Sequence, residues 1–229
     1  MVVVTGRMFR SVRPYLEQAG LDEPVVCYQG AVVADPLTGR FLRHEPIALE
    51  LAREAIAAVQ ESGFSLNCYV DDDLYVAAET AGARAYADFQ HLPLHIVGDL
   101  LPWLDRPPTK LVIVDDPNTL DELKPRLVAR FDGRLFIAKS LPQFLELASP
   151  DVSKGTGMAF LAEHSGFDAA HTVAFGDGEN DLELLDWAGY AVAVENAHDE
   201  VKARADWICP GPRDEGVAAV IEALLDSRS

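Results

Sequence analysis

From Phe144 onward the sequence alternates apolar runs with helical stretches, and this alternation constrains the possible folds more than any other feature. The apolar runs are Phe144–Leu147, Thr172–Phe175, Tyr190–Val194 and Trp207–Cys209. The helical stretches that follow them are Lys154–His164, Glu179–Trp187, His198–Arg204 and Glu215–Leu225. Because a strand that runs parallel to its predecessor needs a crossover segment, such repeats form parallel sheets with helices on both faces. We therefore predict an α/β fold.

The first part of the chain fits the same layers, whereas the middle part differs. The first elements are a strand Val2–Thr5, a helix Met8–Ala19 ended by Gly20, a strand Val25–Tyr28, and a hairpin of Ala31–Ala34 and Phe41–Arg43. The middle elements are a helix Ala48–Ser62, strands Phe64–Val70, Leu74–Ala78 and Lys110–Val114, a helix Thr119–Phe131 and a strand Gly133–Ala138. Prolines interrupt the connections of this middle block. We predict a compact α+β unit inserted within the first.

Composition excludes several classes of function. The 229 residues carry a net charge of −18, which disfavours nucleic-acid binding because that binding depends on neutralising phosphates with Lys and Arg. An anionic substrate would need positive charge concentrated in its site. No apolar run approaches the roughly 18 residues of a membrane helix, and the N-terminus does not have the pattern of a signal peptide. Cys27, Cys68 and Cys209 fit neither a metal spacing nor a disulfide framework, so we expect reduced core residues in a cytoplasmic protein.

The segment Val173–Asp181 carries the strongest chemical signal. An apolar strand ends in Gly-Asp, a glycine turn follows, and a helix begins. Ligands bind at the carboxyl ends of strands in open α/β sheets, so Asp177 would lie at that edge with Asp181 in the first helical turn. Clustered carboxylates there suit a hard cation such as Mg²⁺. The alternative is that acidic residues only stabilise the helix N-terminus.

Ser153–Gly157 favours the functional interpretation. Ser153 is a typical N-cap, but Lys154 places positive charge at a helix N-terminus, where the dipole disfavours it. Gly155 and Gly157 each cost roughly 1 kcal/mol in helix propensity relative to Ala. A phosphate at this N-terminus would meet an ammonium, backbone amides and an unobstructed approach. A surface lysine in a poorly optimised helix is the alternative.

Thr5, Gly6 and Arg7 repeat this arrangement at the end of the first predicted strand. A hydroxyl and exposed backbone amides can hold an anion there, although an ordinary turn would have the same sequence. The acidic turns Asp71–Asp73 and Asp115–Asp116 are expected to be solvated rather than metal-binding. The six His residues form no ligand spacing, and no Ser-His-Asp or Cys-His arrangement is indicated.

These motifs together resemble the haloacid dehalogenase superfamily, specifically its Cof-type phosphatases with a large α/β cap. Val2–Arg7 is similar to the second family motif, and Gln29–Ala31 is similar to an Asn-Gly-Ala turn, with Gln in place of Asn. Phe144–Leu147 with Val152–Gly155 resembles the third motif, and Phe175–Asp181 the fourth.

The resemblance implies a Rossmann-like core from residues 1–46 and 142–229, and an inserted α+β cap, residues 47–141, that selects the substrate. It implies that Asp177 is a Mg²⁺ ligand and that Asp181 supports the metal or orients Lys154. Thr5, Gly6, Arg7 and Asn180 would form the phosphate- and substrate-binding set together with Lys154. The implied partner is a small phosphorylated metabolite, hydrolysed as a phosphomonoester such as a sugar phosphate.

One departure from the family pattern concerns the nucleophile. The family's first motif, Asp-x-Asp, supplies the carboxylate that becomes an aspartyl-phosphate and the acid/base residue. That motif precedes the second motif, which begins here at Val2, so its strand and helix, roughly thirty residues, are expected upstream of this chain. Either the chain starts late, or a shortened form is real and lacks phosphatase activity. A non-catalytic binder of phosphorylated metabolites is the second hypothesis, and a phosphate-accepting signalling domain the third, disfavoured by the large cap.

Overall fold

The computed structural model describes residues 1–226, which form two compact units. The first unit spans Met1–Val152 and the second begins at Ser153. This division does not coincide with the predicted boundaries after residues 46 and 141, because the first unit contains the whole middle block. The assignment of residues 47–141 as an inserted cap therefore stays a prediction, and each unit is described by itself.

The first unit begins with a helix and a small sheet. Helix α1 (Phe9–Ala19) ends at Gly20, whose φ of 66° is the left-handed C-cap conformation predicted from the sequence. Strands β1 (Val25–Cys27), β2 (Val32–Ala34) and β3 (Phe41–His44) pair antiparallel in that order. The predicted strand Val2–Thr5 is reduced to a parallel bridge between Val4 and Val26.

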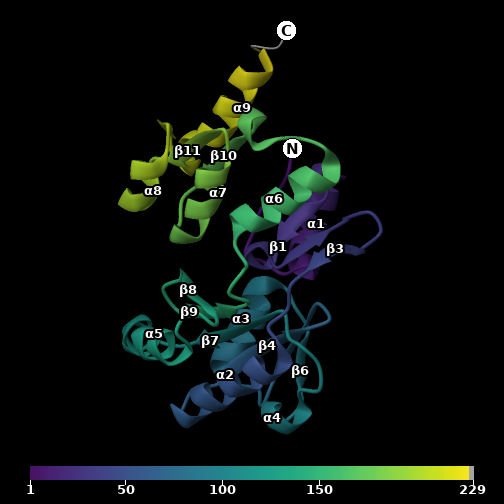
Figure 1. Ribbon diagram of the computed structural model, residues 1–229, viewed down its shortest axis with the longest axis vertical. Helices are drawn as coiled ribbons and strands as arrows, with labels where there is room; N and C mark the ends of the chain where they lie inside the picture. Colours follow the sequence, from purple (N-terminus) through teal and green to yellow (C-terminus); the bar gives the residue numbers. More distant parts are fainter. Residues whose placement is uncertain (227–229) are drawn as a thin grey trace. The chain divides into compact units, whose positions relative to one another are not determined.

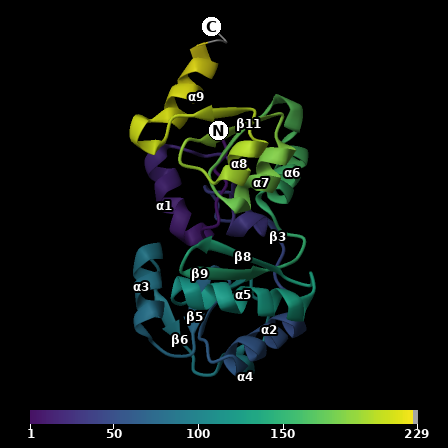
Figure 2. The ribbon, with the colours of Figure 1, turned by 90° about the vertical axis from the view of Figure 1, so that its left-hand side faces the viewer.

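A six-stranded sheet forms the rest of this unit, in the order β6-β5-β4-β7-β9-β8 (Figures 1 and 2). Its strands are β4 (Leu66–Val70), β5 (Asp73–Val76), β6 (Leu94–Ile96), β7 (Lys110–Val114), β8 (Phe136–Leu141) and β9 (Phe144–Ala148). Its helices are α2 (Leu49–Glu61), α3 (Ala81–Gln90), α4 (Leu100–Trp103) and α5 (Pro117–Phe131). The elements predicted for the middle block are thus present, within a few residues of their expected ends.

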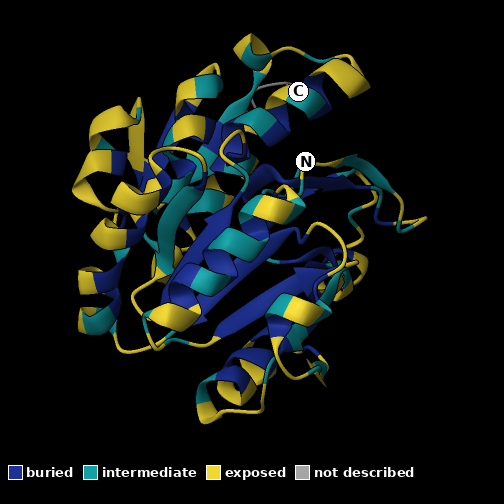
Figure 3. Cartoon of the chain, turned by 60° about the horizontal axis from the view of Figure 1, so that its bottom comes forward, coloured by how far each residue is buried: buried dark blue, intermediate teal, exposed yellow. Residues whose placement is uncertain are grey.

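The two faces of this sheet bury different partners, because successive side chains of a strand point to opposite faces. Leu111 and Leu145 pack with α2, α4 and α5 in one apolar cluster. Tyr69, Val112 and Phe144 pack on the other face with residues of α1, α3 and β1. Strands β4 and β9 are buried along their whole length. Figure 3 draws buried segments in dark blue, several strands among them.

The prediction that Phe144–Leu147 belongs with the parallel repeats was wrong. Strand β9 pairs antiparallel with β7 and with β8, inside the six-stranded sheet. Only Pro142 and Gln143 separate β8 from β9. A link that short permits a hairpin, whereas a parallel neighbour needs a crossover of about a dozen residues or more.

The second unit confirms the predicted parallel arrangement. Strands β10 (Val173–Gly176), β11 (Tyr190–Val194) and β12 (Trp207–Cys209) pair parallel in that order. The accompanying helices are α6 (Lys154–Ser165), α7 (Leu182–Trp187), α8 (Asp199–Arg204) and α9 (Gly216–Asp226), with a 3₁₀ turn η3 (Glu179–Asp181) before α7.

The three cysteines are buried with free thiols, as expected for core residues. Burial raises the pKa of the Cys68 thiol to about 12, which keeps it protonated and inert at neutral pH. Within residues 1–226, no helix combines the length and apolar character needed to cross a bilayer.

Candidate functional site

The loop after β10 is built around the carboxylate of Asp181. One oxygen of Asp181 accepts hydrogen bonds from the backbone N–H groups of Asp177 (2.9 Å) and Gly178 (3.1 Å). A side chain at position 176 would place its Cβ only 2.6 Å from the Cβ of Asp181, so glycine is required there for this close approach. The Gly-Asp-Gly sequence therefore folds back on the residue four positions beyond Asp177.

The second oxygen of Asp181 holds Lys154. The ammonium donates to Oδ1 of Asp181 at 2.5 Å, and the two residues are only 8% and 4% exposed. Burial by itself raises the pKa of the Asp181 carboxyl, but the charge of Lys154 and the hydrogen bonds from three donors outweigh it, so the pKa is lowered. The site therefore holds a charged ion pair at the N-terminus of α6.

The start of α6 follows the predicted capping pattern. The Ser153 hydroxyl accepts from the N–H of Thr156 at 3.0 Å, and the Thr156 hydroxyl accepts from the N–H of Ser153 at 3.0 Å. Gly155 has a packing explanation that the sequence did not reveal, because a Cβ at this position would lie 2.5 Å from the carbonyl oxygen of Glu183. Gly155 therefore no longer argues for a bound anion, whereas the buried ammonium of Lys154 still does.

Asp177 and Asn180 complete this part of the site. Asp177 is exposed, and its carbonyl accepts from the N–H of His198 at 3.1 Å, which ties the loop to the start of α8. The side-chain oxygen of Asn180 lies over Gly178, since a Cβ there would be 2.7 Å from it. Asp177 thus presents a carboxylate to solvent beside the buried ion pair.

The oxygen ligands present here offer Mg²⁺ one carboxylate that has no other contact described above, that of Asp177. Mg²⁺ is commonly held by one or two carboxylates together with waters and substrate phosphates. Asp177 can supply one such carboxylate, while the oxygens of Asp181 already face two amides and an ammonium. Among residues 1–226 no group of three His, Cys, Asp or Glu residues gathers at metal-binding distance. Of the two roles left open for Asp181, the observed contacts match the orientation of Lys154.

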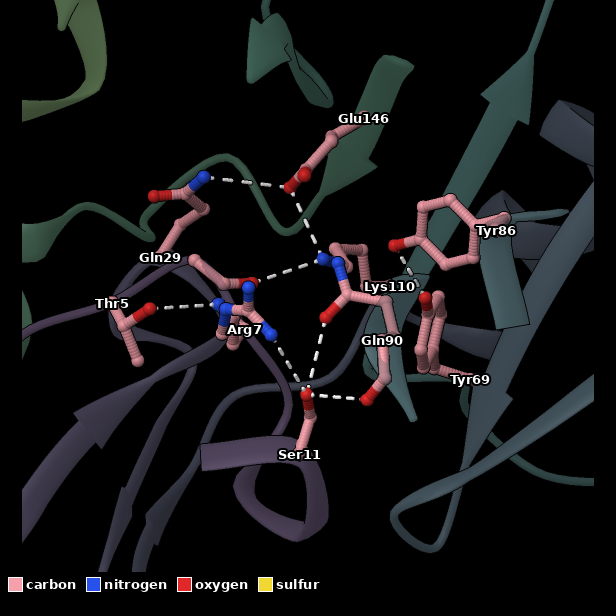
Figure 4. Close-up of polar contacts among 10 residues, drawn as sticks. Thr5, Arg7, Ser11, Gln29, Tyr69, Tyr86, Gln90, Lys110 and Glu146 are labelled. Atoms are coloured by element: carbon pink, nitrogen blue, oxygen red, sulfur yellow. Dashed lines mark hydrogen bonds and ion pairs between the residues drawn. The ribbon is translucent and has the colours of Figure 1, made fainter. Parts of the chain in front are cut away.

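Thr5, Gly6 and Arg7 form a second set of predicted residues, in the first unit (Figure 4). The Thr5 hydroxyl accepts from the N–H of Arg7 at 3.1 Å, which leaves its own hydrogen to donate elsewhere. Gly6 lies against Gln29, whose side-chain nitrogen would be 2.3 Å from a Cβ at position 6. The Arg7 guanidinium donates to the Ser11 hydroxyl at 3.3 Å and so helps to fix the loop to α1.

Each unit therefore assembles its own predicted residues. Lys154, Asp177, Asn180 and Asp181 meet in the loop after β10 and at the start of α6. Thr5, Gly6 and Arg7 meet in the loop before α1. The convergence of both sets on one phosphate stays a prediction.

Sequence reasoning missed a buried ion pair in the first unit. The Lys110 ammonium lies 3.3 Å from the carboxylate of Glu146, and both side chains are almost fully buried. In sequence, each is a single charged residue in an otherwise apolar strand, which usually indicates a solvent-facing position. The detectable signal was that these strands, β7 and β9, are apolar at the positions on both faces and are therefore buried on both faces.

The acidic turn Asp71–Asp73 serves structural contacts. Asp71 pairs with Arg106 at 2.9 Å and Asp73 with Arg10 at 2.5 Å. Asp72 was expected to be solvated, but it is only partly exposed and accepts from the Tyr28 hydroxyl at 2.8 Å. Burial raises the pKa of Asp72 to about 6, against the opposing effect of the Tyr28 hydrogen bond.

Known proteins resemble this chain over nearly its full length. A family model described as haloacid dehalogenase-like hydrolase matches residues 1–221. A crystal structure of a Thermotoga maritima protein superposes with a TM-score of 0.84 at 32% identity, covering 97% of this chain and 84% of that one.

Two proteins named as phosphatases are also similar. The 5-amino-6-(5-phospho-D-ribitylamino)uracil phosphatase of Bacillus subtilis is 27% identical over 96% of this chain and 83% of its own length. The pyridoxal phosphate phosphatase of Escherichia coli is 24% identical over 98% of this chain and 86% of its own.

Proposed function

Because the chain belongs to the haloacid dehalogenase-like hydrolases and its predicted Cof-type character is confirmed, we propose that it hydrolyses a small phosphomonoester in a Mg²⁺-dependent reaction. The observation that carries this proposal is the buried Lys154–Asp181 pair, fixed by the backbone of the Asp177–Gly178 loop at the carboxyl end of a parallel strand. An ammonium held in this way is already oriented before an anion arrives, so it needs little reorganisation to stabilise a developing negative charge.

Each residue of the site has a role in this proposal. Lys154 neutralises charge on the phosphoryl group with the hydrogens that Asp181 does not use. Asp181 orients Lys154 and the loop, and Asn180 contacts the phosphoryl group. Thr5 donates its hydroxyl hydrogen, and the amides around Gly6 and Arg7 add further donors. Asp177 would hold the metal ion, which when bound supplies positive charge to phosphoryl oxygens.

We further propose that the attacking carboxylate lies upstream of Val2 and forms an aspartyl-phosphate. The Asp71–Asp73 turn contains the only Asp-x-Asp spacing in residues 1–226, but two of its carboxylates pair with arginines and the third bonds to Tyr28. Those contacts are typical of structural carboxylates rather than of a free nucleophile. They also support the second candidate function, a chain that binds phosphorylated metabolites without turnover.

The substrate class follows by analogy with relatives. One acts on a phosphoribityl compound and another on pyridoxal phosphate, so both names describe phosphate esters of small polar molecules. We propose the same class for this chain. The acidic surface is compatible with an anionic substrate if Lys154 supplies the local positive charge.

An activity assay separates the two candidates. The chain and a version extended upstream would be compared on a panel of small phosphomonoesters with and without Mg²⁺. We expect Mg²⁺-dependent phosphate release by the extended version and negligible release by residues 1–229. Equal activity of the two would contradict an upstream nucleophile, and saturable ester binding without turnover by both would favour the binding protein.

A further inference from the structure

A buried polar cluster of the first unit has no part in the proposed chemistry as described so far (Figure 4). Lys110 of β7 and Glu146 of β9 are 2% and 5% exposed. Lys110 lies opposite Tyr69, and Glu146 lies opposite Val112, so both point to the sheet face that packs against the start of the chain. Two charges on an otherwise apolar face are costly unless each finds partners.

The Lys110 ammonium connects this sheet to the Thr5–Arg7 loop. Besides the 3.3 Å contact with Glu146, its Nζ donates to the carbonyl oxygen of Gly6 at 3.1 Å. It also lies 5.1 Å from the ring centre of Tyr69 and 5.7 Å from that of Tyr28. Glu146 outweighs the effect of burial and raises the pKa of Lys110, so the ammonium stays charged in this position.

Glu146 is connected to the Thr5–Arg7 loop through Lys110 and also through Gln29. The side-chain nitrogen of Gln29 donates to Glu146 at 3.5 Å, and the side chain covers Gly6. Gln29 has a left-handed φ of 59°, and its N–H donates to the carbonyl of Thr5 at 3.2 Å. Such a backbone conformation persists only where the surrounding contacts enforce it.

The contact with Lys110 fixes the orientation of the peptide unit between Gly6 and Arg7. The carbonyl of Gly6 and the N–H of Arg7 belong to the same planar trans peptide, so they point in opposite directions. Fixing the carbonyl on Lys110 therefore directs the N–H of Arg7 to the Thr5 hydroxyl oxygen, which accepts it at 3.1 Å. An oxygen that accepts this bond has its own hydrogen available for an anion.

We propose that Lys110 and Glu146 are positioning residues for the Thr5–Arg7 loop, which is called the phosphate loop below. Lys110 fixes the Gly6 peptide, and Glu146 holds both Lys110 and Gln29. This inference rests on the proposed contact of Thr5 and Gly6 with the phosphoryl group. The alternative is a pair that only stabilises the fold.

Lys139 provides a control whose ion pair is more exposed, since the side chains of Lys139 and Asp121 are 19% and 63% accessible. It lies in the same sheet, on β8, and its ammonium also contacts one carboxylate, Asp121 at 2.6 Å, and one carbonyl, Pro117 at 3.3 Å. Both partners belong to α5 rather than to the phosphate loop. Lys139→Met therefore removes the same kind of contacts at another place.

Two variants test the pair itself. Lys110→Met leaves Glu146 buried without its cation, which can prevent folding. The double variant Lys110→Met with Glu146→Leu removes both charges, and buried pairs replaced in this way commonly keep their stability. It nevertheless lacks the donor to Gly6, so it isolates the positioning role.

Two measurements are made on the 229-residue chain and its variants. Amide hydrogen exchange at Thr5, Arg7 and Gln29 reports the loop, and calorimetric titration with inorganic phosphate and Mg²⁺ reports anion binding. For the double variant we expect exchange at Arg7 about tenfold faster and phosphate affinity about tenfold lower, since small displacements of a binding group have effects of this size or larger. Lys139→Met should match the parent chain in both.

The outcomes separate this inference from the proposed function. Parent-like exchange and affinity in the double variant would overturn the inference, and so would faster exchange with unchanged affinity, which indicates a purely structural pair. Lys154→Met serves as the test of the proposed function. Undiminished phosphate binding in that variant, or no saturable binding by the parent chain, would overturn the proposed function and the functional part of the inference, while the exchange rates would still decide whether Lys110 fixes the loop.

Discussion

Two buried lysine–carboxylate pairs occur in this protein, one in each unit, and they differ in how they are held. Lys154 is the first residue of α6, and Asp181 lies between the end of β10 and the start of α7. The Asp181 carboxylate accepts from Lys154 and also from two backbone amides of the loop. Lys110 and Glu146 lie within strands, and the ammonium also bonds a carbonyl about a hundred residues away in sequence. The first pair has solvent-exposed Asp177 beside it, whereas the second is enclosed by aromatic rings.

Burial of a charge pair therefore does not by itself indicate its role. A pair at the end of a strand lies near open loops, where a ligand can approach. A pair in the middle of a sheet can reach only other parts of the fold, so it acts on a site through backbone contacts.

Removing one partner of the enclosed pair should have the largest effect. Lys110→Met leaves a buried, unpaired Glu146 and should lower the free energy of unfolding by about 3–5 kcal/mol. The double variant with Glu146→Leu should recover most of that loss, since no buried charge remains. Denaturant unfolding of both variants measures this difference, and equal destabilisation of the two would show that the pair is not enclosed as described.

Removing the ammonium of the Lys154–Asp181 pair, called the loop pair below, should affect function more than stability. In the upstream-extended protein, Lys154→Met should lower the turnover rate about 10²–10³-fold, the usual effect of losing one pre-oriented electrostatic contact. Lys202→Met, in α8 of the same unit, is the matched control and should keep the parent rate. The measurement is phosphate release under saturating substrate, and similar losses in both variants would contradict a specific role for Lys154.

Gly155→Ala tests the contact between α6, which begins at Lys154, and α7, which follows Asp181. Its Cβ would lie 2.5 Å from a backbone oxygen of α7, which cannot turn away as a side chain can, so we expect a loss of about 1–3 kcal/mol in unfolding free energy. Gly82→Ala is the control, because its Cβ would find no atom nearer than 3.7 Å. Unfolding curves for the two variants check the prediction, which a stable Gly155→Ala protein would contradict.

Asp72 is a partly buried carboxylate that bonds to the hydroxyl of Tyr28 rather than to a lysine. Its pKa is raised to about 6, so the folded state holds the proton more tightly than the unfolded state does. Its contribution to stability is therefore complete below the unfolded pKa near 3.8 and is lost as the pH rises through about 6. Discounted for partial solvent access, this amounts to roughly 1–2 kcal/mol.

Asp181 should show the opposite dependence. Its pKa is lowered, so its contribution is present above the unfolded pKa and is lost as the pH falls through the folded pKa. Asp72→Asn should thus remove a fall in stability between about pH 4 and 6, whereas Asp181→Asn should leave that fall in place. Unfolding free energies measured from pH 4 to 7 test both statements, and an unchanged slope in Asp72→Asn would refute the raised pKa.

Much of the second unit could be predicted because its determinants are local. The Ser153 cap and the parallel order of β10, β11 and β12 follow from capping chemistry and from crossover length. The helix end at Gly20, in the first unit, was predicted from capping chemistry in the same way. Lys154 and Asp181 are 27 residues apart, and their meeting was predicted on the ground that both follow strands of one parallel sheet. Strand β9, which precedes Lys154, instead belongs to the six-stranded sheet, so the contact comes from the packing of α6 against η3 and α7 rather than from a shared sheet edge.

The sequence by itself therefore determined the α/β class, the helix ends and the identity of the loop residues Asp177 and Asp181. Only the tertiary structure decided that β9 joins the six-stranded sheet, that Gly155 is required by α7, and that Lys110 and Glu146 meet at Gly6. The physical reason is that caps and turns depend on neighbours within a few residues, whereas strand partners and buried charge pairs depend on which distant surfaces pack together.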